Sequence, residues 1–376
     1  MRLREFFQRL FRRRRARGGG SPHHRPAPQS VEVAASAISS PPVEPPEPMP
    51  ASPSSPPPQP PAGPPVAPPP PVTPPLATPA PEPPAPATAH AATPAADSWP
   101  DTLRLRRLTD ELLPPPVATR LLALVRPTID VVPADVDADL DAASSRIGGN
   151  PLLPPQLRWP HRDGAPLSFL AQVRLEEVAP YDVEGALPPS GLLLFFYGGA
   201  EDAWGFDPDD RLSWRVLLVD PAGVRVRAAP TGAEVFTERG LRPQPVLTLP
   251  DRWSEPMRAL LAAEPAVADV LARFDADRPR LRHRLLGWAQ DGHDSMQRVC
   301  RLAASGVYTG AGAAGAARAD LRLGPAPDPT RDWRLLLQLD SDDVAGMVWG
   351  DECRLYFWVP PGPFDPTAAW MVWRCG

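Results

Sequence analysis

The sequence has 376 residues but no lysine, only three cysteines and no long apolar run. All 39 basic side chains are therefore arginines, which we attribute to codon bias and not to function. The cysteines form no Cys-x-x-Cys pair, and an odd number without zinc-ligand spacing predicts reduced thiols. The longest strongly apolar stretch, residues 192–197, is too short to span a bilayer. Because no signal-peptide pattern follows the first arginines, these absences predict a cytoplasmic protein.

The sequence also lacks a motif that specifies a chemistry. No serine or cysteine lies in a nucleophile-type motif, and we predict no cofactor. Residues 101–376 hold 30 arginines and 38 acidic side chains. This acidic body argues against nucleic-acid binding by the folded part, because such binding depends on neutralising phosphates.

The first 25 residues are strongly basic, with nine arginines against a single acidic residue. Aromatic residues at helical spacing precede a run of arginines, a pattern typical of a short interfacial helix. The residues that define this tip are Phe6, Phe7, Phe11, Arg12, Arg13, Arg14 and Arg15. We expect residues 1–20 to bind an acidic partner or an anionic membrane surface, at the inner face of the membrane. The alternatives are contact with nucleic acid and a solubilising tip that binds nothing specific.

Residues 26–98 are rich in proline and alanine. Of the 59 prolines in the chain, 27 fall between residues 41 and 100, where large apolar side chains are almost absent. Such a segment cannot bury enough surface to offset the entropy of ordering. We therefore predict a disordered linker, which leaves residues 99–376 as the folded domain.

The folded domain mixes helical and strand patterns. Apolar spacing predicts two helices over residues 101–125, separated at the prolines 114–116, and two more over residues 254–274, with Ser254 as an N-cap. Four further segments are typical of strands: a half-buried strand at 168–178, a buried strand at 191–199, a hairpin at 215–227 and a strand at 245–250.

An internal similarity links two parts of this domain. The sequence "FLAQVRL" followed by "GLLLFFY" resembles "LLLQLDS" followed by "CRLYFWV". Each first segment has a central glutamine, Gln172 or Gln338, and each lies downstream of a glycine-bearing segment, "RIGGNPLLP" or "RLLGWAQDG". We interpret this order as a duplicated sheet-forming unit, over about residues 140–235 and 280–376. The expected fold class is α+β, with mainly antiparallel strands and flanking helices.

A segment rich in glycine and proline, "IGGNPLLPPQLRWP" at residues 147–160, precedes the first glutamine-bearing strand. Gly148 and Gly149 allow backbone angles closed to other residues, and Pro151 and its neighbours exclude helix. Trp159 supplies a large apolar face. We predict a rigid cover across the end of a sheet, and the glycine pair belongs to neither of the two common phosphate-binding loop patterns.

These stretches resemble the YwqG-like family of bacterial proteins, whose domain has no established function. The motifs are "SRIGGNPLLPPQLRWP" with "PLSFLAQVRL", "HRLLGWAQDGHDSMQRVC" and "DWRLLLQLDSDDVAGMVWGDECRLYFWV". The last contains Trp349 and Gly350, which we expect to be structural, and Cys353 stands where the family usually has glycine. The resemblance covers roughly residues 100–376 and implies an α+β fold with a repeated unit. It carries over no catalytic residue.

An acidic group near the C-terminal strands is a candidate metal site. Carboxylates at a strand end and in the loop beyond it can converge on a divalent cation that prefers oxygen ligands. The residues are Asp340, Asp342, Asp343 and Asp351, and their spacing is not that of an EF-hand. The alternative is a solvated loop whose aspartates bond turn backbone.

Other polar residues are candidates for a ligand site or for structural hydrogen bonds. His283 and His293 flank a glycine-bearing segment that contains Asp291, and a His–Asp pair can act as a base and its orienting group. Gln172 and Gln338 could line a cleft between the repeats or bond neighbouring backbone. For all five residues the structural alternative is a surface or hydrogen-bonded position, and we expect the cysteines to be buried small thiols.

Three function classes follow from these observations. The first is a protein- or ligand-binding module, tethered by the proline-rich linker to a basic localising tip, and its protein partner is unidentified. A toxin-neutralising protein is a special case of this class. The second is a metal-assisted hydrolase that uses Asp340, Asp342 and Asp351. The third is a structural domain that fills space in a larger assembly.

Overall fold

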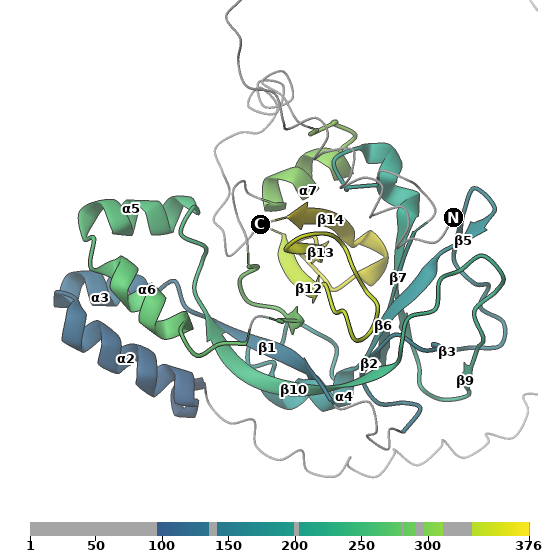
Figure 1. Cartoon of the computed structure of the whole chain (residues 1–376), viewed down its shortest axis with the longest axis horizontal. Helices are drawn as coiled ribbons and strands as arrows, with labels where there is room; N and C mark the ends of the chain where they lie inside the picture. Colours follow the sequence, from purple (N-terminus) through teal and green to yellow (C-terminus); the bar gives the residue numbers. More distant parts are fainter. Residues whose placement is uncertain are drawn as a thin grey trace, which may run out of the picture. The chain divides into compact units, whose positions relative to one another are not determined.

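The computed structural model describes part of the chain, drawn in colour in Figure 1. The described residues are 96–134, 141–198, 203–279, 281–290, 296–310 and 333–375. The predicted basic tip, nearly all of the predicted linker, and the site candidates Asp291 and His293 lie outside these residues. Among the described residues, no helix is long and apolar enough to cross a membrane.

Four of the described helices, α2, α3, α5 and α6, fall close to the segments predicted for them, whereas α4 and α7 were not predicted. Three begin with proline in the first turn, where its missing N–H has no intrahelical partner to lose. Ser254 precedes α5 as predicted, but its side chain makes no capping hydrogen bond. The helices are α2 (Pro100–Leu112), α3 (Pro115–Leu122), α4 (Leu175–Val178), α5 (Glu255–Ala263), α6 (Val267–Asp275) and α7 (Met296–Ala304). Short 3-10 turns cover Ala96–Ser98, Ala179–Tyr181, Pro208–Ser213 and Pro366–Ala368.

The strands form one ten-stranded sheet and two small two-stranded sheets. The large sheet has the order β14-β13-β12-β11-β1-β10-β2-β6-β7-β8, and every neighbouring pair is antiparallel, which confirms the expected mainly antiparallel α+β fold. Its strands are β1 (Arg126–Pro133), β2 (Arg146–Ile147), β6 (Ser168–Arg174), β7 (Leu192–Tyr197), β8 (Trp214–Val219), β10 (Arg239–Thr248), β11 (Arg284–Leu285), β12 (Arg334–Asp340), β13 (Cys353–Val359) and β14 (Trp370–Cys375). The small sheets pair β3 (Leu152–Leu153) with β9 (Arg225–Val226), and β4 (His161–Arg162) with β5 (Ala165–Pro166).

The centre of the large sheet is the pairing of β1 with β10. Sequence analysis predicted only the end of β10, within residues 245–250, and missed β1, because both strands contain prolines. The register runs without interruption from Arg126 opposite Thr248 to Pro133 opposite Leu241. Leu241 donates its backbone N–H to Ser145 O, and Leu247 donates to Asp101 Oδ2, so alternate N–H groups of β10 face away from β1. The prolines at 243 and 245 share that orientation and therefore cost no hydrogen bond to β1.

The large sheet curls until its two edge strands approach each other. Trp214 of β8 and Trp370 of β14 meet edge to face with ring centroids 5.1 Å apart, and Trp214 Nε1 donates to Ala369 O at 2.9 Å. The segment around Trp204 lies along the outer edge of β14, where Trp373 N donates to Trp204 O. The result is a large, nearly closed sheet, and in Figure 1 its blue and teal strands curve around its yellow strands.

Both faces of the sheet are covered, which corrects the prediction of a half-buried strand at 168–178. Along β7, Leu193, Phe195 and Tyr197 belong to the main core, and the alternate residues belong to a second cluster on the other face. Strand β6 is buried on both faces and ends at Arg174, where α4 begins. A third cluster joins α2, α3, α5 and α6, which form the helical layer on the left of Figure 1.

The segment at residues 147–160 covers a face of the sheet and not its end. Leu152, Leu153 and Trp159 pack in the same cluster as Phe169 and Phe196. Trp159 Nε1 donates to Leu167 O at 2.8 Å, and its ring meets Phe196 edge to face. The backbone of this segment also bonds residues 225–227, so the predicted hairpin at 215–227 does not form: β9 pairs with β3 instead of β8.

Two glycines at the start of this segment meet the predicted need for unusual backbone angles. Gly148 has φ 65° and Gly149 has φ 69°. A Cβ on Gly148 would lie 2.3 Å from Thr237 O, and a Cβ on Gly149 would lie 2.0 Å from Glu238 Oε2. Position 148 therefore requires glycine for space as well as for conformation, because the clash is with backbone. At Gly149 the nearest atoms belong to the movable Glu238 side chain, so conformation is the main requirement.

We predict that Gly148→Ala destabilises the domain by about 3 kcal/mol or more, because the left-handed angle and the backbone clash both contribute. Gly164→Ala is the matched control, since Gly164 has φ 80° but a Cβ there would meet no atom within 4 Å. It should cost only about 1 to 2 kcal/mol. The measurement is urea unfolding, and equal losses for the two variants would contradict the steric argument.

Candidate functional site

Gln172 lies on β6 opposite Arg146 of β2, and its side chain bonds backbone on both sides. Its Nε2 donates to Ser144 O at 3.0 Å, and its Oε1 accepts from Leu152 N at 3.2 Å. These bonds fix the start and the end of the glycine turn to the sheet. Because the side chain is fully buried and engaged, it holds structure in place.

Gln338 occupies the matching position on β12, opposite Arg284 of β11. Its Nε2 donates to Arg282 O at 2.9 Å, and its Oε1 accepts from Gln290 N at 2.9 Å. The two glutamines therefore make matching bonds. Each Nε2 donates to a carbonyl just before the short strand, β2 or β11, and each Oε1 accepts from an N–H beyond the turn that follows that strand. The turn after β11 repeats the left-handed angles of Gly148 and Gly149, with φ 61° at Leu286 and 65° at Gly287.

His283 is buried between two of the predicted metal ligands. Its Nδ1 accepts from Asp340 N at 3.1 Å, so Nε2 carries the proton and faces Asp342 Oδ2 at 3.7 Å. Arg239 donates to the same Asp342 oxygen at 2.6 Å. Burial raises the pKa of Asp342, but the nearby His283 ring and hydrogen bonds from the backbone of Ala345 and from Arg239 outweigh it and hold the pKa at about 2.

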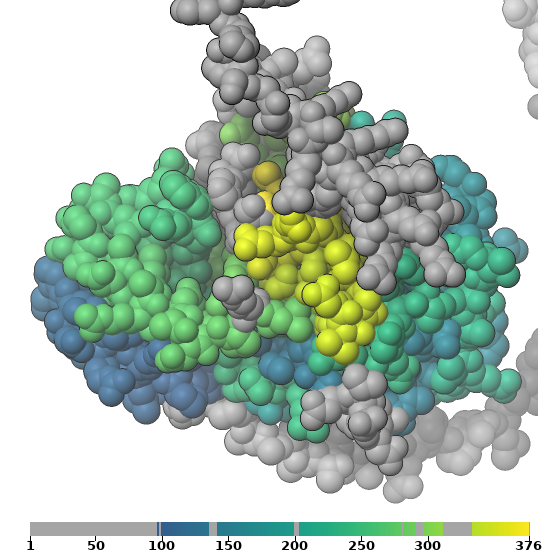
Figure 2. All heavy atoms as spheres, in the orientation of Figure 1, coloured from purple at the N-terminus to yellow at the C-terminus, as the bar shows by residue number. Residues whose placement is uncertain are grey.

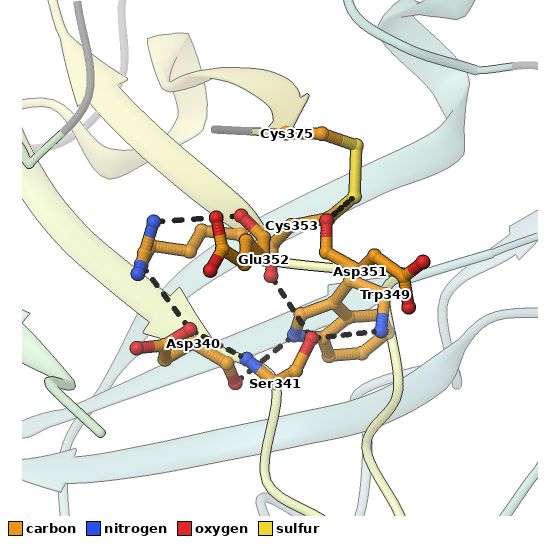
Figure 3. The surroundings of a disulfide bond; sticks show 8 residues. Asp340, Ser341, Trp349, Asp351, Glu352, Cys353 and Cys375 are labelled. Carbon is orange, nitrogen blue, oxygen red and sulfur yellow. Dashed lines mark hydrogen bonds and ion pairs between the residues drawn. A yellow bond between two sulfur atoms is a disulfide. The ribbon is translucent and has the colours of Figure 1, made fainter. Parts of the chain in front are cut away.

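Asp340 also has protein partners, which Figure 3 shows in part. It accepts from Arg282 N at 3.1 Å and forms an ion pair with Arg354 at 3.2 Å. Asp343 and Asp351 are exposed. Among the described residues, no three His, Cys, Asp or Glu side chains form a group that could hold a metal ion. The metal site stays a prediction, and the geometry gives Asp340 and Asp342 a role in anchoring the loop that follows β12.

Cys353 and Cys375 form a disulfide, which corrects the expectation of reduced thiols (Figure 3). They are register partners on β13 and β14 and stand 22 residues apart in the sequence. Strand pairing brings them together, and cysteine spacing alone does not reveal it. The third cysteine, Cys300, is buried, as expected. Trp349 is buried beside this region and donates from Nε1 to Asp340 O at 3.2 Å.

The structure also contains a pocket that sequence analysis missed. It has a volume of about 310 Å³ and lies between the end of β10, helix α6 and the residues around β11. Its polar wall carries Arg252, Arg278, Arg282, Arg284 and Gln290. Its apolar wall carries Leu249, Leu261, Ala268, Leu271, Ala272 and Phe274. On the face drawn in Figure 2, the green residues around α5 and α6 lie beside the yellow C-terminal strands.

Three of the pocket arginines are largely buried, and they differ in how fully they are paired. The Arg278 guanidinium is bound by Asp101 at 2.9 Å and by Asp275 at 3.2 Å. Arg284 is 3.1 Å from Asp130, but within the described part of the chain its buried Nε has no acceptor. Arg282 donates from Nε to Pro279 O, and its terminal nitrogen reaches Asp275 only at 3.9 Å.

The electrostatics of Arg282 reflect this incomplete pairing. Burial lowers the pKa of Arg282, and repulsion by Arg284 lowers it further. Asp275 opposes this, Arg278 adds a smaller repulsion, and Asp130 has a small opposing effect. An anion in the pocket would relieve this repulsion. The sequence signal was the alternation of arginines in "RPRLRHR", which places successive cations on one face of an extended segment.

The fold and this site define an α+β domain with a nearly closed antiparallel sheet and an arginine-lined pocket at its helical layer. The family model described as "Domain of unknown function (DUF1963)" matches residues 145–375, and the chain belongs to that family. No curated protein matches the chain.

We predict that the low pKa of Asp342 makes stability depend on pH. The folded pKa of about 2 lies below the unfolded value of about 3.9, so the carboxylate contributes fully above about pH 5 and its contribution falls toward pH 2. The stability difference between the wild type and Asp342→Asn should therefore shrink by about 2 kcal/mol over that range. Asp343→Asn, at an exposed neighbour, is the control. An unchanged difference between pH 5 and pH 2 would show that Asp342 has an ordinary pKa.

We predict that reducing the disulfide lowers the free energy of unfolding by about 3 kcal/mol, because a short loop is then released in the unfolded chain. Cys375→Ser should be destabilised to the same extent and should not respond to a dithiol. Thermal unfolding with and without reductant measures both effects. Finding three reactive thiols in the denatured, unreduced protein would overturn the assignment.

Proposed function

We propose that this chain is a binding module for a small anionic ligand, which the arginine-lined pocket holds. One observation carries the proposal: Arg278, Arg282 and Arg284 line a single pocket with side chains only 10%, 12% and 4% exposed. Buried cations need partners. Arg278 and Arg284 have close carboxylates, whereas Arg282 reaches one only at 3.9 Å. Arginine is also the side chain best suited to bind carboxylate or phosphate through paired hydrogen bonds.

The charge balance of the lining supports an anion. Arg252 adds a fourth cation, and the acidic lining residues are Asp251 and Asp275. Asp101 and Asp130, which lie outside the lining, pair with Arg278 and Arg284, so Arg282 and Arg252 are the cations best placed to bind an anion. Asp251 accepts from the backbone of Trp253, and Asp275 is more than half exposed. The pocket volume lies at the small end of the range for ligand sites in proteins. A single small molecule suits this space better than a protein surface does.

The composition of the lining favours binding over catalysis. Within the described residues that line the pocket, there is no serine, cysteine or histidine. The metal-assisted hydrolase would need oxygen atoms of Asp340 and Asp342 that already accept hydrogen bonds from the protein. The toxin-neutralising alternative has no comparable support among the contacts of the described residues.

We also propose that the two halves of the sheet are copies of one unit. The strands β2, β6 and β7 correspond in order to β11, β12 and β13, on either side of the β10 and β1 pair. The matched bonding of Gln172 and Gln338 supports this correspondence. In this scheme the pocket belongs to the second copy, next to α6. The YwqG-like motifs fall largely within the matched residues 145–375, and we propose that the two family descriptions concern the same domain.

For residues outside the described part, the hypothesis drawn from the sequence stays a proposal. The proline-rich linker at 26–98 would tether the module to the basic tip at 1–25, and the tip would hold the protein at an anionic surface. In this proposal the tip determines where the module is held, and the pocket determines which ligand it binds.

The test is calorimetric titration of the full chain with inorganic phosphate at low salt. We expect binding by the wild type and about tenfold or greater weakening in Arg282→Gln, because a charge-assisted hydrogen bond is lost. Arg225→Gln is the matched control, since Arg225 is an exposed arginine on β9, outside the pocket. It should bind as the wild type does. Absent binding, or equal binding by both variants, would refute the proposal.

A further inference from the structure

The apolar wall of the pocket is continuous with the polar wall along one helix. Ala268, Leu271, Ala272 and Asp275 of α6 line the pocket, and their spacing places them on one helical face. The first three are apolar, and Asp275 ends the helix beside Arg278 and Arg282. The pocket therefore changes from apolar to charged over a distance of about 10 Å along the helix axis.

The apolar part of this wall has uncovered surface. Leu249, Leu261 and Leu271 are only partly buried, although they pack against the core of the helical layer. Two small side chains, Ala268 and Ala272, also line the pocket and are exposed. Partly exposed leucines inside a concave site favour a ligand with apolar surface of its own.

The charged end offers more than one cation to a head group. Phe274 is buried under the Arg278 guanidinium, whose centre lies 4.5 Å from the ring centroid, so that arginine is held against the wall. Arg282 is the less constrained neighbour, because its contact with Asp275 is long. A carboxylate or a phosphate monoester can accept from both arginines at once.

We propose that the ligand is an amphipathic anion. Its head group, a carboxylate or a phosphate monoester, is held by Arg278 and Arg282 beside Arg284. Its unbranched apolar tail lies along Ala268, Leu271 and Ala272. This inference rests on the proposed function and adds the chemical class and the orientation of the ligand.

The experiment is a chain-length series with the full-length protein. Titration calorimetry compares inorganic phosphate with butyl, hexyl and octyl phosphate, and hexanoate with octanoate, all below their micelle concentrations. Each added methylene should tighten binding about threefold to fourfold until the tail fills the pocket, as burial of about 0.8 kcal/mol per methylene implies. The phosphate and carboxylate arms show which head group is preferred.

Two variants test the position of the tail. Ala272→Leu should fill the apolar end and reduce the gain between butyl and octyl phosphate at least tenfold, and Leu271→Gln should reduce it by making that wall polar. For each variant the gain is measured relative to its own affinity for inorganic phosphate. Ala263→Leu, at an exposed alanine of α5 outside the pocket, is the matched control and should keep the full gain.

The outcomes separate this inference from the proposed function. If inorganic phosphate binds and depends on Arg282 but the chain-length series is flat, the amphipathic ligand is wrong and the anion-binding module stands. If inorganic phosphate does not bind, the proposed function fails first. If Ala272→Leu keeps the gain, the tail lies elsewhere and the inference is overturned. Binding to vesicles of anionic phospholipid, without binding to monomeric alkyl phosphates, would also overturn it in favour of a membrane surface.

Discussion

The pairing of β1 with β10 is the constraint on which the rest of the sheet depends. These two strands join the four strands on one side to the four on the other, through an uninterrupted register. Each half then adds the same sequence of parts: a two-residue strand, a glutamine-bearing strand and an aromatic strand. Because this central pair links the two halves of the described sheet, both halves can curl around the same core.

The sequence was most informative where the pattern and the local chemistry agreed. The glutamine-bearing strands, the aromatic strands and the α2, α3, α5 and α6 segments could be predicted, because apolar spacing and proline punctuation point to the same elements. The glycine pair at 148–149 was also predictable, since its angles exclude other residues. Strand β1 and the first part of β10 could not be predicted, because prolines that normally argue against a central strand sit where their missing N–H groups face away from the partner.

The candidate site was harder to predict, since it depends on contacts between distant segments. Arg282 and Leu271 belong to a loop and a helix whose proximity no local pattern reveals. The acidic group was visible in the sequence, but the positions of Arg239, Arg354 and His283 around it were not. The same limit applies to Cys353 and Cys375, which only the β13–β14 register brings together.

The place of β1 in the sheet also bears on how the family domain is delimited. The matched span begins at residue 145, after β1 ends at Pro133. A chain trimmed to that span would lose the strand that both β10 and β11 bind, and two unpaired edges would open in the middle of the sheet. The sheet of this protein therefore includes a central strand upstream of the region by which its family is recognised, and a version without that strand would present two exposed edges of the kind through which proteins self-associate.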